Sequence, residues 1–295
     1  MDKIGNIVNT KNIIDKNDFY IKKKFGQNFL TDQNILNKIV DTANLTKEDD
    51  VIEIGPGLGA LTEIIASKCN RLLCYEIDKD LIPILKNNLK EFNNISFINE
   101  DVLKCDVNKD IDTYFENHKR IVLISNLPYY ITTPIILGLL EATSKIETYV
   151  MMMQEEVADR ICSKPAVKDY NALSIAVQYR AHASKEIRVP RTVFVPQPNV
   201  DSAVIKLELY KEKKYNPNDE KLFFKIVRAS FAQRRKTLAN NLSLIGYNKD
   251  YIYNALDKLG YDKNIRSEAL DVSDFVRLSD WFGDNKWLKK RHMLK

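Results

Sequence analysis

Residues 51–62 read Val-Ile-Glu-Ile-Gly-Pro-Gly-Leu-Gly-Ala-Leu-Thr, an apolar run that passes through a glycine-rich turn into the start of a helix. A strand, a tight turn and a helix in this order let the backbone approach a nucleotide closely. Glu76 ends the next apolar run, about 20 residues further on, where a carboxylate can accept hydrogen bonds from both ribose hydroxyls. The stretch therefore predicts an α/β fold that holds a nucleoside cofactor at the turn.

Apolar runs and amphipathic stretches alternate along the chain from about residue 30. This pattern predicts β-strands at 51–54, 72–76, 95–98, 121–124 and 149–153, and helices in most of the stretches between them. Two later runs, 186–189 and 203–210, are expected to add a terminal antiparallel pair. Strands that alternate with helices form a parallel, doubly wound sheet, so the predicted fold is Rossmann-like α/β.

Composition divides the chain into three parts. Residues 1–20 are rich in Asn, Lys and Asp and predict a flexible N-terminal extension, followed by the α/β domain over 21–210. The segment 211–218 is polar, charged and interrupted by Pro, which is typical of a linker. Only helical spacing follows it, so residues 211–295 predict a small all-helical domain that ends in a basic tail over 286–295.

Bulk composition excludes several classes of protein. With 44% hydrophobic and 29% charged residues in 295, the chain is expected to form a core rather than to be disordered. No apolar run approaches the roughly 18 residues that span a bilayer, and no apolar signal core begins the chain, which predicts a cytoplasmic protein. Its four cysteines contain no C-x-x-C pair, so we expect reduced thiols and no metal. Nothing in the sequence demands more than a monomer.

The glycine string does not by itself select the cofactor. Gly55-x-Gly57-x-x-Ala60 also satisfies the dinucleotide pattern, so NAD and S-adenosylmethionine are both open, because each carries a nucleoside that an acid can hold. A dehydrogenase needs a general acid beside the nicotinamide, and neither His118 nor His182 has a catalytic setting in the sequence.

Two features at later strand ends favour the methyl donor. After the third predicted strand, the Asp101 side chain can accept from an adenine amino group while the Val102 backbone N–H donates to the ring. Asn126 ends the fourth predicted strand, close to where a sulfonium methyl would project at the carboxyl edge of the sheet.

The loop after that strand, Asn126-Leu127-Pro128-Tyr129, has the groups that a planar base with an exocyclic amine requires. The Asn126 oxygen and the Leu127 carbonyl can accept the protons of the amine, Pro128 keeps the backbone out of a helix, and the Tyr129 ring can stack on the base. The motif favours an N-methyltransferase that acts on adenine. An ordinary Asn-Pro turn with a Tyr lid is the alternative.

Basic residues gather between 221 and 241 without any acid. Spacings of four, three and seven place Lys221, Lys225, Arg228 and Arg235 on one predicted helical face, which suits RNA phosphates. A solvated helix face is the alternative. The RNA-binding residues predicted here are Lys221, Lys225, Arg228, Arg234, Arg235 and Lys236.

Taken together, the motifs resemble those of the ribosomal RNA adenine N6,N6-dimethyltransferase family, of the KsgA/RsmA type that modifies small-subunit RNA. The resemblance covers roughly residues 22–270. It is carried by Lys23-Lys24-Phe25-Gly26-Gln27-Asn28-Phe29-Leu30, Glu53-Ile54-Gly55-Pro56-Gly57, Glu76, Glu100-Asp101, Asn126-Leu127-Pro128-Tyr129, Gln154-Glu155-Glu156-Val157-Ala158-x-Arg160, Phe194-Val195-Pro196-Gln197-Pro198-x-Val200-Asp201-Ser202-Ala203-Val204 and Phe231-x-x-Arg234-Arg235-Lys236-Thr237-Leu238.

The resemblance implies a class I methyltransferase fold and a role in ribosome biogenesis. It implies that two methyl groups pass from S-adenosylmethionine to N6 of each of two adjacent adenosines in the 3′-terminal hairpin of 16S rRNA, within an immature small subunit. It assigns cofactor binding to Asn28, Leu30, Gly55, Glu76, Asp101 and Asn126, to which the spacing adds Gly57 and Val102. It also places Phe194 against the far face of the target adenine, although Phe194 between two valines is typical of a core aromatic.

Three other functions remain open for this motif set. The macrolide-resistance methylases act on large-subunit RNA, and the mitochondrial transcription factor B proteins share the fold. The motifs over 194–204 and 234–238 resemble the small-subunit enzyme more closely. A ribosome-assembly or RNA-binding factor without methylation is the third alternative, which an intact motif at Asn126 argues against.

Overall fold

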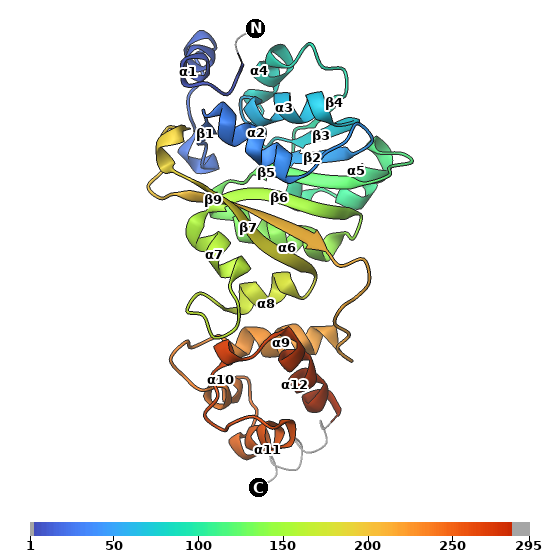
Figure 1. Ribbon diagram of the computed structural model, residues 1–295, viewed down its shortest axis with the longest axis vertical. Coiled ribbons are helices and arrows are strands. Elements are labelled where there is room, and N and C mark those ends of the chain that lie inside the picture. The colour runs from blue at the N-terminus through green and yellow to red at the C-terminus, as the bar shows by residue number, and fades with distance from the viewer. Residues whose placement is uncertain (1–2, 285–295) are drawn as a thin grey trace. The chain divides into compact units, whose positions relative to one another are not determined.

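The structure, a computed structural model, describes residues 3–284 and divides them into two compact units (Figure 1). The first unit comprises residues 3–158 and 183–209, and the second comprises 159–182 and 210–284. The sequence predicts one boundary near residue 210, whereas the second unit also takes residues 159–182. None of the helices within residues 3–284 is long and apolar enough to cross a membrane.

A seven-stranded sheet forms the centre of the first unit, in the order β4-β3-β2-β5-β6-β9-β7. Its strands are β2 Asp50–Ile54, β3 Arg71–Tyr75, β4 Ile95–Ile98, β5 Ile121–Asn126, β6 Ile146–Gln154, β7 Ala181–Val189 and β9 Ser202–Leu209. Adjacent strands from β4 to β6 pair in parallel, and β9 pairs antiparallel with β6. The predicted parallel sheet with late antiparallel strands is confirmed.

Helices cover the sheet because its central strands are buried on both faces, as in other parallel sheets. They are α2 Gln33–Thr42, α3 Ala60–Lys68, α4 Leu81–Asn88, α5 Val107–Tyr114 and α6 Thr132–Ala142, whereas α7 Glu155–Cys162 begins in the first unit and ends in the second. Ile39 of α2 and Ile65 of α3 belong to one core cluster with Val51, Val122 and Val150 of three neighbouring strands. Residues at alternate positions of the same strands point to the opposite face.

The N-terminal segment packs on the first unit. Helix α1 spans Ile7–Lys16, and Asn6 caps it by accepting from the Asn9 backbone nitrogen at 2.7 Å. Ile4, Ile13 and Phe19 are buried in a cluster with Leu85 of α4. The sequence predicts a flexible extension here, because its apolar residues are few. These few apolar side chains nevertheless lie close together and pack against α4.

A short two-stranded sheet holds the segment that precedes α2. Strand β1 (Phe29–Leu30) pairs antiparallel with β8 (Phe194–Val195), and Leu30 lies opposite Phe194. Residues 22–30, which we call the strap, reach β1 through a short 3-10 helix at Lys23–Phe25. A pairing between segments so far apart in sequence fixes where the strap runs.

The second unit is helical over residues 210–284, as predicted. Its helices are α8 Ala172–Gln178, α9 Glu220–Ser230, α10 Leu238–Ser243, α11 Lys249–Leu259 and α12 Val272–Asp284. The core is rich in aromatic rings, among them Phe223, Tyr251, Phe275 and Phe282. The predicted basic tail over 286–295 lies outside the described residues.

Candidate functional site

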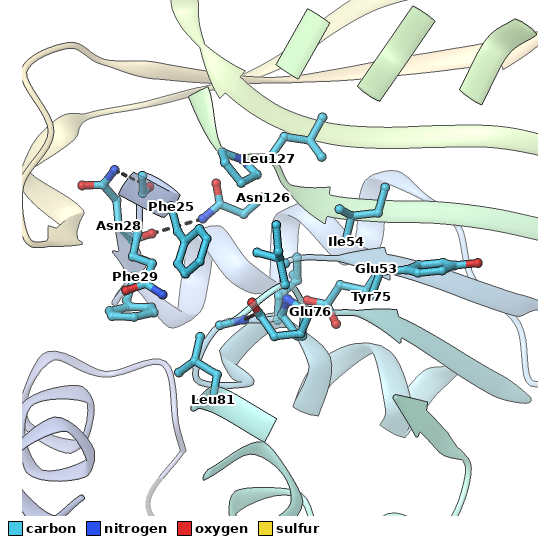
Figure 2. A pocket seen from close by; sticks show the side chains of 18 of the residues that line it. Phe25, Asn28, Phe29, Glu53, Ile54, Tyr75, Glu76, Leu81, Asn126 and Leu127 are labelled. Carbon is cyan, nitrogen blue, oxygen red and sulfur yellow. Dashed lines mark hydrogen bonds between the residues drawn. The ribbon is translucent and has the colours of Figure 1, made fainter. Parts of the chain in front are cut away.

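One pocket opens at the carboxyl ends of the parallel strands in the first unit (Figure 2). Its open volume is about 1110 Å³, a figure that includes solvent at the mouth. The structure brings together at this pocket all eight residues predicted to bind the cofactor, which are Asn28, Leu30, Gly55, Gly57, Glu76, Asp101, Val102 and Asn126. Leu127, Pro128 and Tyr129 line it as well.

The glycine-rich turn between β2 and α3 forms the floor of the pocket. Gly55, Gly57 and Gly59 have φ angles of +69°, +61° and +96°, in the left-handed region that side chains with a Cβ rarely adopt. A Cβ on Gly57 would lie 3.1 Å from Cε1 of Phe29, a strap residue. Glycine therefore keeps this part of the cradle open to a ligand.

Glu76 follows β3 and presents a buried carboxylate to the pocket. Its two oxygens accept from the backbone nitrogens of Gly57 at 3.3 Å and of Asp78 at 2.8 Å. Burial raises the pKa of Glu76 to about 7 in spite of these two hydrogen bonds. A carboxylate with so few donors around it fits a ligand that brings hydroxyl donors, such as a ribose.

Asp101 stands at the start of a 3-10 helix, Val102–Lys104, after β4. Its Oδ1 accepts from the Leu103 backbone nitrogen at 3.0 Å, which fixes the carboxylate beside the buried Val102. Acid, apolar side chain and backbone amide together fit the edge and face of an adenine ring.

Asn126 ends β5 and is oriented by the strap. Its Nδ2 donates to the backbone oxygen of Asn28 at 3.3 Å (Figure 2), so the amide oxygen is left to accept from another group. The next peptide is anchored as well, because the Leu127 nitrogen donates to the Met152 oxygen at 3.1 Å. The Pro128 oxygen accepts from Thr132 Oγ1 at 2.9 Å. The loop is therefore rigid at the point where an amine would bind.

Tyr129 contributes a partly exposed ring to the pocket. Its hydroxyl shares a hydrogen bond of 2.6 Å with Ser202 Oγ of β9, which holds the ring in one orientation. Burial raises the pKa of Tyr129, so it stays protonated near neutral pH. The ring is thus a neutral stacking surface.

Phe194, which the resemblance places against the target adenine, is a core residue in this structure. It is only 3% exposed, belongs to the main core cluster with Leu30 and is not among the residues that line the pocket. The pairing of β8 with β1 turns its ring into the core. Phe194 is therefore a core residue in this structure, and its predicted contact with the target adenine stays a prediction.

Sequence reasoning missed several residues of the pocket wall. Glu53 is 1% exposed on β2, and burial raises its pKa to about 8. An acid inside an otherwise apolar strand was the available signal. Tyr130, which is 53% exposed, and Thr10 of α1 also line the pocket. Nothing local in the sequence marks Thr10, because α1 reaches the pocket only through tertiary packing.

The predicted RNA-binding residues all lie exposed on the second unit. Lys221, Lys225 and Arg228 occupy the outer face of α9, opposite the buried Phe223 and Val227. The prediction that Arg235 continues this face is wrong, because α9 ends at Ser230. Arg234, Arg235 and Lys236 instead belong to the turn before α10, where Arg234 donates to the Lys168 backbone oxygen.

Comparison with known proteins gives a consistent result. Residues 18–284 match the family model described as ribosomal RNA adenine dimethylase. The chain is 48% identical over 275 residues to "Ribosomal RNA small subunit methyltransferase A" of Bacillus mycoides (strain KBAB4), which covers 92% of this chain and 94% of that protein. The protein of the same name from Bacillus anthracis (strain CDC 684 / NRRL 3495) matches with the same identity and coverage.

Two solved structures share the fold. A dimethyladenosine transferase from Plasmodium falciparum superposes with a TM-score of 0.73 at 25% identity, over 87% of this chain and 98% of that one. The 23S rRNA methyltransferase ErmE superposes with a TM-score of 0.66 at 26% identity, over 86% of this chain and 99% of that one.

Proposed function

This chain belongs to the ribosomal RNA adenine dimethylase family, and from that premise we propose that it dimethylates N6 of two adjacent adenosines in the 3′-terminal hairpin of 16S rRNA. Family membership makes it an S-adenosylmethionine-dependent rRNA adenine dimethyltransferase. The choice of the small subunit is supported by the names of the relatives that are 48% identical. We place it in the cytoplasm, acting as a monomer on immature small subunits.

The arrangement around Asn126 supports this proposal most strongly. Its amide is held at the end of β5 by Asn28, in the same pocket as Glu76 and Asp101. One end of the pocket therefore fits a nucleoside, and the other presents hydrogen-bond acceptors and the Tyr129 ring to a second base. No protein nucleophile is needed, because the cofactor supplies an already activated sulfonium methyl.

The protein's part in the reaction is to orient the amine. The Asn126 oxygen and the Leu127 carbonyl would accept hydrogen bonds from the two N6–H groups, which would direct the nitrogen lone pair toward the methyl donor. S-adenosylmethionine, which Glu76, Asp101 and the turn at Gly57 would hold, would supply an activated sulfonium methyl group, and the surplus N6 proton would leave to solvent. Tyr129 stacks on the adenine throughout. For the second transfer, the one remaining N6 hydrogen must again meet an acceptor.

The second unit would hold the RNA backbone. Lys221, Lys225 and Arg228 on α9, with Arg235 and Lys236 in the following turn, offer exposed positive charges that can replace counterions on phosphates. These contacts do not read sequence, so they would contribute affinity, while the Asn126 loop selects the base.

Labelled methyl transfer tests the proposal. Small subunits and, separately, large-subunit RNA from cells that lack this activity are incubated with the protein and labelled S-adenosylmethionine, and the nucleosides are then analysed. Dimethyladenosine confined to small-subunit RNA is the expected result. Label only in large-subunit RNA would favour a function like that of ErmE, and bound cofactor without transfer would favour an assembly factor.

A further inference from the structure

A closed network of side chains joins the strap to the loop after β3. We propose that Lys22, Gln27 and Asp78 form a clamp that positions the strap for cofactor binding, an inference that rests on the proposed cofactor site. None of the three was predicted to bind the cofactor, and none of them needs to touch the reacting atoms. Asp78 is the positioning residue at the centre.

The geometry of the clamp is closed on itself. Lys22 Nζ donates to Asp78 Oδ1 and to Asp80 Oδ2, at 2.5 Å each. Gln27 Nε2 donates to Asp78 Oδ2 at 2.8 Å, and the Lys22 backbone nitrogen donates to Gln27 Oε1 at 2.7 Å. Both oxygens of Asp78 are thus engaged by the strap. Such a cycle fixes the two segments in one register.

Both ends of the clamp lead directly to residues of the pocket. On one side, the Asp78 backbone nitrogen donates to Oε1 of Glu76, the proposed ribose acid, at 2.8 Å. On the other side, Gln27 precedes Asn28, whose carbonyl oxygen accepts from Asn126. The clamp therefore ties the wall that binds the ribose to the wall that orients the catalytic amide.

Burial makes the clamp sensitive to the loss of one partner. The Asp78 side chain is 1% exposed, whereas that of Lys22 is 26% exposed. A buried carboxylate that loses its lysine is left with an uncompensated charge, and the strap is then repelled or released. The two carboxylates also raise the pKa of Lys22, which keeps the lysine charged in the working pH range.

A direct contact between Lys22 and RNA is the competing role for this residue. The two functions predict different kinetic changes. A phosphate contact would alter the KM for RNA and leave cofactor binding intact, whereas a clamp alters cofactor binding in the absence of RNA. The full-length protein serves for both measurements.

The test compares Lys22→Met with Lys79→Met. Lys79 is exposed on the same loop and outside the network, so its substitution removes the same charge. Binding of S-adenosylmethionine is measured by calorimetry without RNA, together with kcat and both KM values. Lys22→Met should weaken cofactor binding about tenfold, as the loss of one charge-assisted hydrogen bond does, with kcat at saturating cofactor largely kept. Lys22→Arg should restore binding, and Lys79→Met should match the wild type.

Other outcomes are equally decisive. Unchanged cofactor affinity in Lys22→Met, or a rise only in the KM for RNA, would overturn the clamp. Asp80→Asn, which removes the exposed second partner of Lys22, should have a smaller effect than Lys22→Met. If Lys22→Met unfolds, Gln27→Leu is measured in its place, with the same expectation and the same refutation. Failure of the wild type to bind S-adenosylmethionine would instead reject the proposed function.

Discussion

Replacing Asn126 by Ala separates catalysis from cofactor binding. The substitution removes the oxygen proposed to accept an N6 proton and the Nδ2 that donates to the Asn28 backbone oxygen at 3.3 Å. Removing one preorganised hydrogen-bonding group from a transition state lowers kcat by about 10²–10³, or roughly 3–4 kcal/mol. Losing a long neutral hydrogen bond costs only about 0.5–1.5 kcal/mol, which limits the loss of cofactor affinity to about tenfold.

The assay is single-turnover methyl transfer to small subunits at saturating S-adenosylmethionine, with cofactor affinity measured separately by calorimetry. Asn126→Asp is the matched variant, because it keeps an acceptor oxygen and loses the donor to Asn28. It should recover part of the turnover that Asn126→Ala loses. An unchanged rate in Asn126→Ala, or a fall in cofactor affinity larger than the fall in kcat, would refute the reasoning.

Three further predictions concern the pocket. Ionised Glu76 accepts hydrogen bonds from ribose hydroxyls, and its pKa lies at about 7, so cofactor affinity measured by calorimetry should rise with pH. One pH unit below that pKa, the affinity should be about tenfold weaker than at high pH. Glu76→Gln should flatten this pH profile, and a flat wild-type profile would contradict the assignment. Gly57→Ala should lower the free energy of unfolding in urea by about 1–2 kcal/mol and should also weaken cofactor binding. Gly246→Ala, at φ +89° with open space around it, should lower the free energy of unfolding through backbone strain and leave cofactor binding unchanged. Tyr129→Phe keeps the ring and loses the hydrogen bond to Ser202, so it should cost about 1 kcal/mol of stability and leave kcat near wild type. Tyr129→Ala should lower kcat/KM for RNA by tenfold or more, since stacking contributes about 1–3 kcal/mol. Equal activity of these two variants would exclude stacking.

The sheet could be predicted because each of its strands is marked locally. Residues 51–54 and 121–124 are short apolar runs rich in Val and Ile and bounded by turn residues, which is typical of buried parallel strands. Residues at the carboxyl ends of these strands, such as Glu76 and Asn126, then meet at one edge by topology alone. The predicted cofactor-binding residues therefore line one pocket, whereas the contribution of Thr10 could not be predicted, because α1 reaches the pocket through tertiary packing.

Features that depend on distant pairings could not be predicted in this way. The ring of Phe194 points into the core because β8 pairs with β1, which lies more than half the chain away. The clamp between Lys22 and Asp78 likewise joins charges that no sequence periodicity connects. The predicted face through Arg235 was wrong for a local reason, because Thr237 caps a new helix after α9 has ended.

Mass analysis of the 3′-terminal fragment of 16S rRNA tests the central claim most directly. Small subunits from cells that lack this activity are methylated to completion by the protein, and the fragment is isolated and sequenced by mass spectrometry. We predict two methyl groups on N6 of each of two adjacent adenosines, and none of them with Asn126→Ala over the same time. Methyl groups at other positions, or full methylation by Asn126→Ala at the wild-type rate, would contradict the account.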